Sequence, residues 1–302
     1  MISDRIHGEG GLNCPASRIF MSHRKDLALD YGMSNENLIE IRSLNSFYNT
    51  LQVLFDISFA IPKRRVTVIM GVSGCGKTTL LRHLTGLKET GANQIFIDGE
   101  DLGAFSETML MKYRRRIGVL FQSGALFNSL SLTENISIPL KVHTKLADET
   151  IRIMSVMKLN LVGLAEFCGY MPSQISGGMK KRAGLARALI MDPEILFVDE
   201  PSSGLDPITA AGLDRLILEL RETLGMTVVV VTHELASAFK IADRILVMDG
   251  GKILAAGNPE EVRNSADERV RQFLNREADT YKKHMDSYYE RLLDATGKCP
   301  LE

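Results

Sequence analysis

The stretch that decides the fold is Val66–Thr78, which reads VTVIMGVSGCGKT. It opens with a short apolar, β-branched run that meets glycine at once, and this pattern predicts a buried strand. The rest matches GxxxxGK followed by Ser or Thr, in which the glycines let successive backbone N–H groups surround phosphate oxygens. Lys77 would supply a cation for the phosphates, and Thr78 a hydroxyl for Mg²⁺. The stretch therefore predicts a nucleotide-binding loop between a strand and a helix.

A helix is expected to follow the loop, over residues 77–87. Leu80, Leu84 and Leu87 recur at steps of four and three residues, which is the spacing of one helix face. The positive end of this helix points toward the phosphate that the loop surrounds. The residues expected to contact the nucleotide in this segment are Gly71, Val72, Ser73, Gly74, Cys75, Gly76, Lys77, Thr78 and Thr79.

A second motif is an apolar run that ends in two acids, Ile195–Glu200, with the sequence ILFVDE. We expect Asp199 to hold Mg²⁺ through water. Glu200, one residue on, points elsewhere and can polarise the attacking water as general base. Adjacent carboxylates at the end of a strand are common on protein surfaces. With a phosphate loop upstream, the pair predicts hydrolysis of a nucleoside triphosphate.

Composition limits the location and the partners. The 36 Lys and Arg against 37 Asp and Glu give a net charge of −1, which lacks the basic excess of a nucleic-acid binder. No apolar run approaches the length of about 18 residues that a membrane span needs, and the N-terminus lacks the pattern of a signal peptide. The four cysteines (Cys14, Cys75, Cys168 and Cys299) show no zinc spacing and are expected to be free thiols. The chain should be cytoplasmic, with any membrane link made through a partner.

The expected elements alternate between strands and helices from residue 37 to about 260, which predicts a mostly parallel sheet covered on both faces. The expected helical segments are 77–87, 130–188 and 207–224. The expected strands are Leu38–Ile41, Val53–Ile61, Val66–Met70, Ile195–Val198 and Thr227–Val231, with a hairpin of Arg244–Met248 and Lys252–Ala256.

Three parts are expected along the chain. Residues 1–36 are polar and weakly patterned, and we expect them to be disordered or to precede a true start at Met21 or Met33. Residues 37–264 form the ATPase domain, with a helical subdomain at about 123–188. Residues 265–302 form an amphipathic helical extension, whose apolar stripe packs on its own domain or, alternatively, on a partner subunit. The stripe comprises Val270, Phe273, Leu274, Tyr281, Met285, Tyr288 and Leu292.

Ile175–Arg182, which reads ISGGMKKR, resembles the signature loop of ABC ATPases. It opens a helix expected over residues 180–189, so its N–H groups form a second anion-binding end. One subunit does not need two such ends for one triphosphate. Ser176, Gly177 and Gly178 make sense if they cap the γ-phosphate held by a second copy, which predicts a two-fold dimer around two ATP molecules. The alternative is an ordinary serine N-cap.

Four more segments resemble motifs of that family. Pro201–Asp206 resembles the D-loop, and His233, at the end of a strand, resembles the switch histidine that contacts the γ-phosphate. Gln122 resembles the Q-loop glutamine, which reaches Mg²⁺ and the attacking water and begins the helical segment that touches the permease. Tyr48 resembles the aromatic residue that stacks on adenine. A strand-end histidine or a strand-edge tyrosine can also be purely structural, but here all the motifs follow the family's order.

The chain is identified as a member of the ABC ATPases over about residues 37–260. The resemblance implies an α/β P-loop NTPase fold of ABC type, with a mostly parallel sheet core, an antiparallel β subdomain and a helical subdomain. It implies ATP and Mg²⁺ as ligands. The catalytic residues would be Glu200, His233 and Gln122, the metal residues Thr78, Gln122 and Asp199, and further nucleotide contacts Tyr48, Ser176, Gly177, Gly178 and Asp206.

Two segments depart from many relatives in an informative way. The signature has Met179 where glutamine is common, and the Q-loop reads FQSGALF over residues 121–127. Both features resemble MlaF-type ATPases of phospholipid-transport systems associated with MCE-domain proteins. That branch implies an MlaE-like permease, an MCE-domain protein and in some systems a STAS-domain protein, with the ATPase on the cytoplasmic face of the inner membrane. It also implies that the C-terminal tail can clasp the neighbouring ATPase.

Two other functions stay open. One is an ABC importer branch for small solutes. The other is a soluble ABC protein that acts on ribosomes or DNA, although such proteins typically carry two nucleotide domains or a long coiled-coil insertion. The presence of Glu200 and His233 argues against a regulatory module without hydrolysis.

Overall fold

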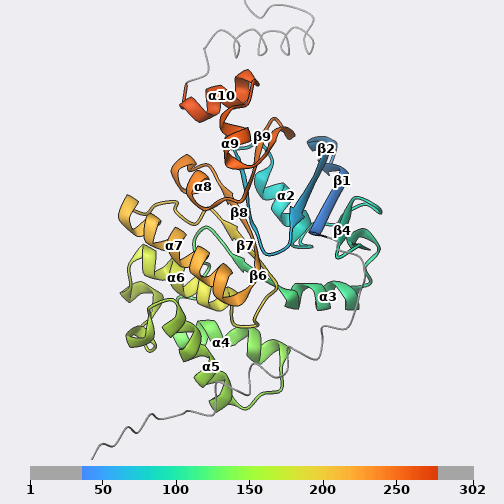
Figure 1. The fold of residues 1–302 in the computed structure, drawn as a ribbon. Coiled ribbons are helices and arrows are strands. Elements are labelled where there is room, and N and C mark those ends of the chain that lie inside the picture. Colours follow the sequence, from blue (N-terminus) through green and yellow to red (C-terminus); the bar gives the residue numbers. More distant parts are fainter. Residues whose placement is uncertain (1–35, 278–302) are drawn as a thin grey trace, which may run out of the picture. The chain divides into compact units, whose positions relative to one another are not determined.

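The central sheet has the strand order β10-β9-β3-β8-β7-β6 (Figure 1). This computed structural model describes residues 36–277. All neighbours in the sheet are parallel except β9 and β10, which form the predicted antiparallel hairpin. The predicted mostly parallel core is therefore confirmed. The strands are β3 (Val66–Gly71), β6 (Ile117–Leu120), β7 (Ile195–Asp199), β8 (Thr227–Thr232), β9 (Arg244–Asp249) and β10 (Lys252–Gly257).

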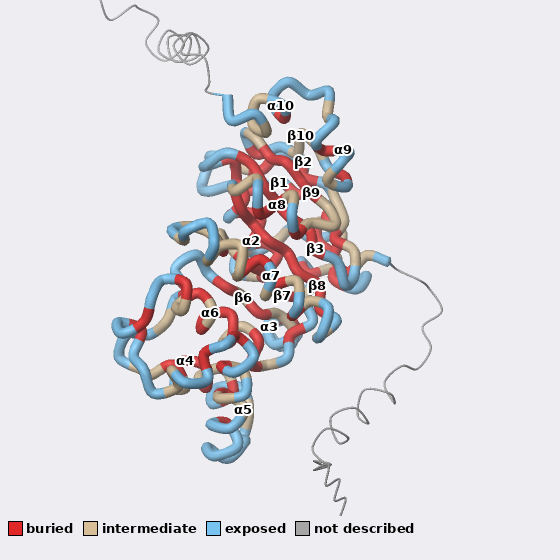
Figure 2. Tube along the Cα trace, turned by 60° about the vertical axis from the view of Figure 1, so that its left-hand side comes forward, coloured by how far each residue is buried: buried red, intermediate tan, exposed pale blue. Residues whose placement is uncertain are grey.

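Two apolar cores lie on opposite faces of this sheet, because successive strand residues point to opposite sides. Leu196 and Val198 of β7 belong to one core, and Ile195 and Phe197 belong to the other. Every residue of β3 and β8 is buried, and Figure 2 shows the buried colour running along both strands. A strand covered on both faces is continuously apolar rather than alternating, which explains the runs in the sequence.

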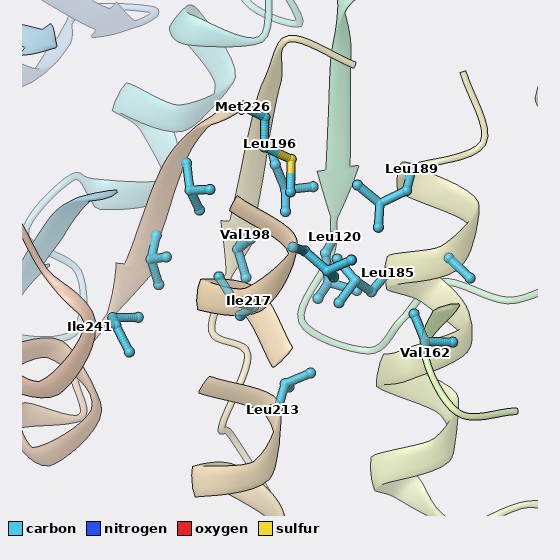
Figure 3. Packing of buried hydrophobic residues seen from close by; sticks show 14 of the residues in the cluster. Leu120, Val162, Leu185, Leu189, Leu196, Val198, Leu213, Ile217, Met226 and Ile241 are labelled. Carbon is cyan, nitrogen blue, oxygen red and sulfur yellow. The ribbon is translucent and has the colours of Figure 1, made fainter. Parts of the chain in front are cut away.

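Helices supply one of these cores. Leu185 lies on α6 (Gly177–Ala188), Leu189 caps that helix, and Leu213 lies on α7 (Pro207–Leu224). These three leucines belong to the same core as Leu196 of the sheet (Figure 3). The helix after the phosphate loop, α2 (Lys77–Leu84), belongs to the other core. The remaining helices are α3 (Glu107–Arg116), α4 (Leu132–His143), α5 (Asp148–Leu161), α8 (Leu235–Ile241), α9 (Pro259–Arg263) and α10 (Glu268–Asn275), with short 3₁₀ turns at 102–104, 165–167 and 172–174.

A second, antiparallel sheet has the order β2-β1-β4-β5. Its strands are β1 (Asn37–Tyr48), β2 (Leu51–Pro62), β4 (Ile95–Ile97) and β5 (Glu100–Asp101). β1 continues seven residues beyond the predicted end at Ile41. The extension was hidden because register shifts interrupt the pairing and Ser43 has φ 46°, so the alternation of polar and apolar residues is lost.

Two predicted helix boundaries were wrong by about one turn. α2 ends at Leu84 instead of Leu87, where Thr85 closes the helix and Gly86 has φ 66°. α6 starts at Gly177 rather than Lys180, because Ser176 is its N-cap. The largely helical stretch expected over 130–188 consists of the three helices α4, α5 and α6, and Gly163 takes φ 73° in the connection between α5 and α6.

The last described helix, α10, packs on its own domain. Val270 is fully buried, and Phe273 and Leu274 contact the same core. α10 ends at Asn275 because Arg276 adopts the left-handed conformation, with φ 58°. Residues 1–35 of the predicted N-terminal extension, and the stripe positions Tyr281, Met285, Tyr288 and Leu292, lie outside the described residues. None of the helices within residues 36–277 combines the length and the apolar character of a membrane span.

Candidate functional site

The phosphate loop connects β3 to α2, as predicted. Its first glycine passes close to β9, and a Cβ added at Gly71 would lie 2.1 Å from the Met248 carbonyl oxygen. Gly76, with φ 104°, immediately precedes α2 in a conformation that side chains disfavour. The loop therefore needs glycine at both positions for steric reasons, independently of any ligand.

Lys77 is buried at the start of α2. Its Nζ donates hydrogen bonds to the carbonyl oxygens of Gly71 (2.8 Å) and Val72 (2.9 Å). The ammonium is thus held over the loop by the loop's own backbone. Thr78 is exposed beside it, while Thr79 is buried and only 8% exposed. No acidic residue occupies the first turn of α2, so the helix N-terminus stays positive.

Asp199 ends β7 and lies close enough to the phosphate loop for the charge of Lys77 to lower the pKa of its carboxyl. Burial raises the pKa of the Asp199 carboxyl, and the neighbouring Glu200 raises it further. The charges of Lys77, Arg82 and Lys181 oppose this rise. The carboxylate oxygens of Asp199 are hard ligands of the kind that divalent cations such as Mg²⁺ prefer.

A magnesium ion fits this arrangement only together with a nucleotide. Within residues 36–277, no three His, Cys, Asp or Glu side chains gather to hold a metal by themselves. Mg²⁺ commonly takes one or two protein oxygens and completes its shell with water and substrate phosphates. The Asp199 carboxylate and the exposed Thr78 hydroxyl have the chemistry for the protein part of that shell.

Glu200 is fixed by several independent bonds. Its backbone N–H donates to the Val231 carbonyl (2.8 Å), and its own carbonyl accepts from Lys181 Nζ (2.9 Å). The carboxylate accepts a bond from the Thr232 hydroxyl at 3.3 Å. The backbone of Glu200 has φ 48°, a left-handed conformation that costs free energy in a residue other than glycine. The carboxylate is therefore held in place at a local cost in stability.

His233 completes this cluster from the end of the neighbouring strand. β7 and β8 are parallel, so their carboxyl ends meet at one edge of the sheet. His233 Nδ1 lies 2.8 Å from Glu200 Oε1, with 56% of the histidine side chain exposed and only 14% of the glutamate. The pair thus joins a shielded carboxylate to an imidazole that reaches solvent.

Gln122 meets the segment after Glu200. Its Nε2 donates to Ser203 Oγ (3.2 Å), and the Ser203 N–H donates to the Glu200 carbonyl (3.3 Å). Gln122 was expected to begin the helical segment that touches the permease, and the first helix of that segment, α4, starts at Leu132. Residues 121–131 form turns between β6 and α4. The glutamine is therefore presented by a loop.

Asn135 holds that loop, and the sequence reasoning missed it. The residue is fully buried, and its Nδ2 donates to the carbonyls of Phe127, Leu130 and Ser131, each at 3.0 Å. The Phe127 N–H donates to Asn135 Oδ1 at 2.7 Å. A polar residue on the apolar face of a helix was the one available signal.

Ser176 and Asp206 both serve as helix caps in this single chain. Ser176 Oγ accepts from the Met179 N–H (3.3 Å), and Asp206 Oδ1 accepts from Ile208 (3.1 Å) and Thr209 (3.0 Å). Hydrogen bonds, chiefly from Thr209, lower the pKa of Asp206. Ser176 is exposed, and within residues 36–277 no hydrogen bond joins it to the phosphate loop. The capping alternative is thus satisfied, and the two anion-binding ends stay separate within one copy.

Comparison with known proteins identifies the family. The family described as ABC transporter matches residues 54–203. The MlaF protein of Haemophilus influenzae, an ATP-binding protein of an intermembrane phospholipid transport system, is 41% identical over 246 residues, which cover 81% of this chain and 93% of that protein. The chain belongs to the ABC transporter ATP-binding family. MlaF of Escherichia coli K12 is 42% identical over 244 residues, covering 80% of this chain and 90% of that protein.

Other members of the ABC family carry different names. The mkl protein of Mycobacterium tuberculosis, named for ribonucleotide transport, is 41% identical over 238 residues, 78% of this chain and 66% of that protein. Among solved structures, cbiO1 of Clostridium perfringens matches with a TM-score of 0.70 and 29% identity, covering 83% of this chain and all of that one. The dimeric cassette MJ0796 with ADP and Pi matches with a TM-score of 0.67 and 29% identity, covering 73% and 98%.

The ABC fold brings most of the predicted site residues together. The loop of residues 71–79, Asp199, Glu200 and His233 gather at the carboxyl ends of the parallel strands, and Gln122 joins them through Ser203. Tyr48 lies nearby at the end of β1, bonded to Thr79 and Arg82 of α2. Ser176, Gly177, Gly178 and Asp206 mark the starts of α6 and α7. This chain is an ABC ATPase.

Proposed function

We propose that two copies of this chain enclose two ATP molecules and that hydrolysis of this ATP powers a phospholipid transporter. The observation that carries the proposal is the Glu200–His233 pair, joined at 2.8 Å beside the phosphate loop. A general base needs a fixed position near the reacting water, and four protein groups hold Glu200 there.

ATP binding is assigned to the phosphate loop and the residues around it. The N–H groups of residues 71–79 and the start of α2 surround the phosphates, and Lys77 turns its ammonium from the loop carbonyls toward them. Tyr48 stacks on the adenine. Thr78, Asp199 and Gln122 provide the protein ligands for Mg²⁺, which when bound neutralises developing charge on the phosphate oxygens.

Hydrolysis is assigned to three side chains. Glu200 accepts the proton of the attacking water, while Gln122 orients that water. His233 contacts the γ-phosphate and, through its bond to Glu200, keeps the carboxylate oriented. These groups act largely by positioning and charge, which is how phosphoryl transfer is generally catalysed.

The dimer follows from the two separate anion-binding ends. Because Ser176 caps α6 and remains exposed, its hydroxyl can donate to a phosphate held by another copy. The γ-phosphate would thus be bound by Lys77 of one copy and Ser176 of the partner subunit. The dimeric MJ0796 structures, 29% identical to this chain, support the arrangement. Hydrolysis removes the shared phosphate, and the two copies separate because only the closed state satisfies both ends.

The membrane partner is proposed from the exposed Q-loop. Phe121 and Phe127 flank it and are 41% and 54% exposed, which suits docking of an MlaE-like permease. The ATPase would then lie on the cytoplasmic face of the inner membrane, with MCE-domain and STAS-domain proteins as further partners. Similarity to MlaF of two bacteria supports phospholipid as cargo, and similarity to mkl keeps ribonucleotide-like solutes as the second candidate.

The substitution Glu200→Gln tests the catalytic assignment. It keeps the shape of the side chain but removes the base, so turnover should fall at least about a hundredfold while ATP still binds. Glu219→Gln, an exposed acid on α7, is the matched control and should hydrolyse ATP normally. Near-normal turnover in Glu200→Gln would remove Glu200 from this role.

The cargo needs a separate experiment. The chain would be purified from membranes with its hydrophobic subunit, and ATPase activity measured in liposomes against added ribonucleotides. Bound phospholipid in the complex, with no response to ribonucleotides, is the expected result. Purification without any hydrophobic subunit would favour the soluble alternative.

A further inference from the structure

Side-chain hydrogen bonds join the end of helix α2, and the residues just after it, to the end of β1. His83 Nε2 lies 2.8 Å from Ser46 Oγ, and both residues are only 2% exposed. One residue further along β1, the Phe47 carbonyl accepts a hydrogen bond from Lys88 Nζ at 2.8 Å. Lys88 is itself anchored, because its N–H donates to the Arg82 carbonyl at 3.0 Å.

The same lysine contacts the ring of Tyr48. Lys88 Nζ lies 4.2 Å from the ring centroid, well within the distance at which a cation is attracted to an aromatic face. At the other end of the ring, Arg82 Nη1 donates to the tyrosine hydroxyl at 3.2 Å. Hydrogen bonding with Thr79, and then the Arg82 guanidinium, lowers the pKa of Tyr48.

These contacts matter because the surrounding hairpin is open to solvent. Phe47 is 49% exposed, Tyr48 is 40% exposed and Leu51 is 69% exposed. An aromatic ring at such a turn would sample several orientations, and ordering it on ligand binding would cost free energy. The contacts to α2 remove much of that freedom before any ligand arrives.

We infer that Lys88 is a positioning residue for the base of the nucleotide. Its ammonium covers one face of the Tyr48 ring, holds the preceding carbonyl, and leaves the opposite face of the ring for a purine. The inference rests on the proposed adenine-stacking role of Tyr48. It adds a link that couples the base site to α2, the helix that also begins at the phosphates.

The test compares Lys88→Met with the unaltered chain in steady-state ATPase assays. Methionine keeps the length and the apolar stem but removes the ammonium. The KM for ATP should rise about three- to fivefold, the loss expected for one exposed cation–aromatic contact, with kcat unchanged. Inhibition by inorganic tripolyphosphate, which has no base, should stay the same. Lys88→Arg should restore the KM, because a guanidinium also stacks on aromatic rings.

Two controls separate this effect from general damage. Lys112→Met removes an exposed lysine from α3 and should leave the KM unchanged. The melting temperature of Lys88→Met should match that of Lys112→Met. A KM for ATP that stays constant or falls in Lys88→Met would overturn the inference, since a fall means that lysine competes with the base for the ring. Equal weakening of tripolyphosphate would also overturn it, by locating Lys88 at the phosphates.

Tyr48→Ala distinguishes the inference from the proposal beneath it. If Tyr48→Ala raises the KM for ATP and Lys88→Met does not, the positioning role of Lys88 is wrong and the stacking role of Tyr48 stands. If Tyr48→Ala leaves the KM unchanged, the stacking role itself is wrong, and the inference fails with it.

Discussion

Acidification should destabilise this protein through one buried histidine. His83 lies on α2 with 2% exposure, and burial, followed by the charge of Lys88, lowers its pKa from 6.5 to about 4. Between these pH values the unfolded chain binds the proton and the folded chain does not, so the free energy of unfolding decreases as the pH falls. The stabilisation is complete above pH 6.5 and is lost progressively toward pH 4. At about pH 4.5 the cost is about 2.5 kcal/mol.

The assay is urea unfolding from about pH 7 to about pH 4.5, with His83→Gln as the comparison. Burial raises the pKa of Asp199 and of Asp214. Protonation of these two acids as the pH falls therefore increases the free energy of unfolding, which opposes the effect of the histidine. Both acids are present in either protein, so the difference between the two pH profiles isolates His83. The unaltered chain should lose about 2.5 kcal/mol more than the variant. Parallel profiles, or an NMR titration of His83 near its ordinary pKa, would refute the reasoning.

Two further substitutions test the framework of the site. Asn135→Ala leaves the carbonyls of the Q-loop without their donor and should lower the free energy of unfolding, measured in urea, by about 2–4 kcal/mol. The control, Asn160→Ala at an exposed position, should change the free energy of unfolding by less than about 0.5 kcal/mol. An equal loss in both variants would contradict the role of the buried Asn135. Gly71→Ala places a methyl group 2.1 Å from a backbone oxygen and should abolish ATP binding, as measured by calorimetry, whereas Gly169→Ala, at a glycine outside the phosphate loop, meets no atom within 4 Å and should retain it. Comparable binding by the two glycine variants would show that the close approach at Gly71 is unimportant.

The central strands were predictable because each is short, apolar and ended by a residue with a chemical role. β3, β7 and β8 are buried on both faces, so their hydrophobic runs are unbroken and end at Gly71, Asp199 and Thr232. The far end of β1 was not predictable in this way, since its bulges disturb the alternation before Tyr48 is reached.

The contacts that hold the site in place were the harder part. Lys181 lies within the signature motif on α6, yet nothing local indicates that it donates to the carbonyl of Glu200, the residue that follows β7. Lys88 and Tyr48 are 40 positions apart, and no periodic pattern connects them. Such bonds depend on the tertiary arrangement, whereas the motif residues are recognisable by their order along the chain.

The most direct measurement of the central claim is a structure of full-length Glu200→Gln with ATP and Mg²⁺. We expect two copies with two nucleotides, each terminal phosphate lying between Lys77 of one copy and Ser176 of the partner subunit. One isolated copy with bound ATP and a solvent-facing Ser176, or a dimer whose contacts leave both nucleotides uncovered, would contradict it.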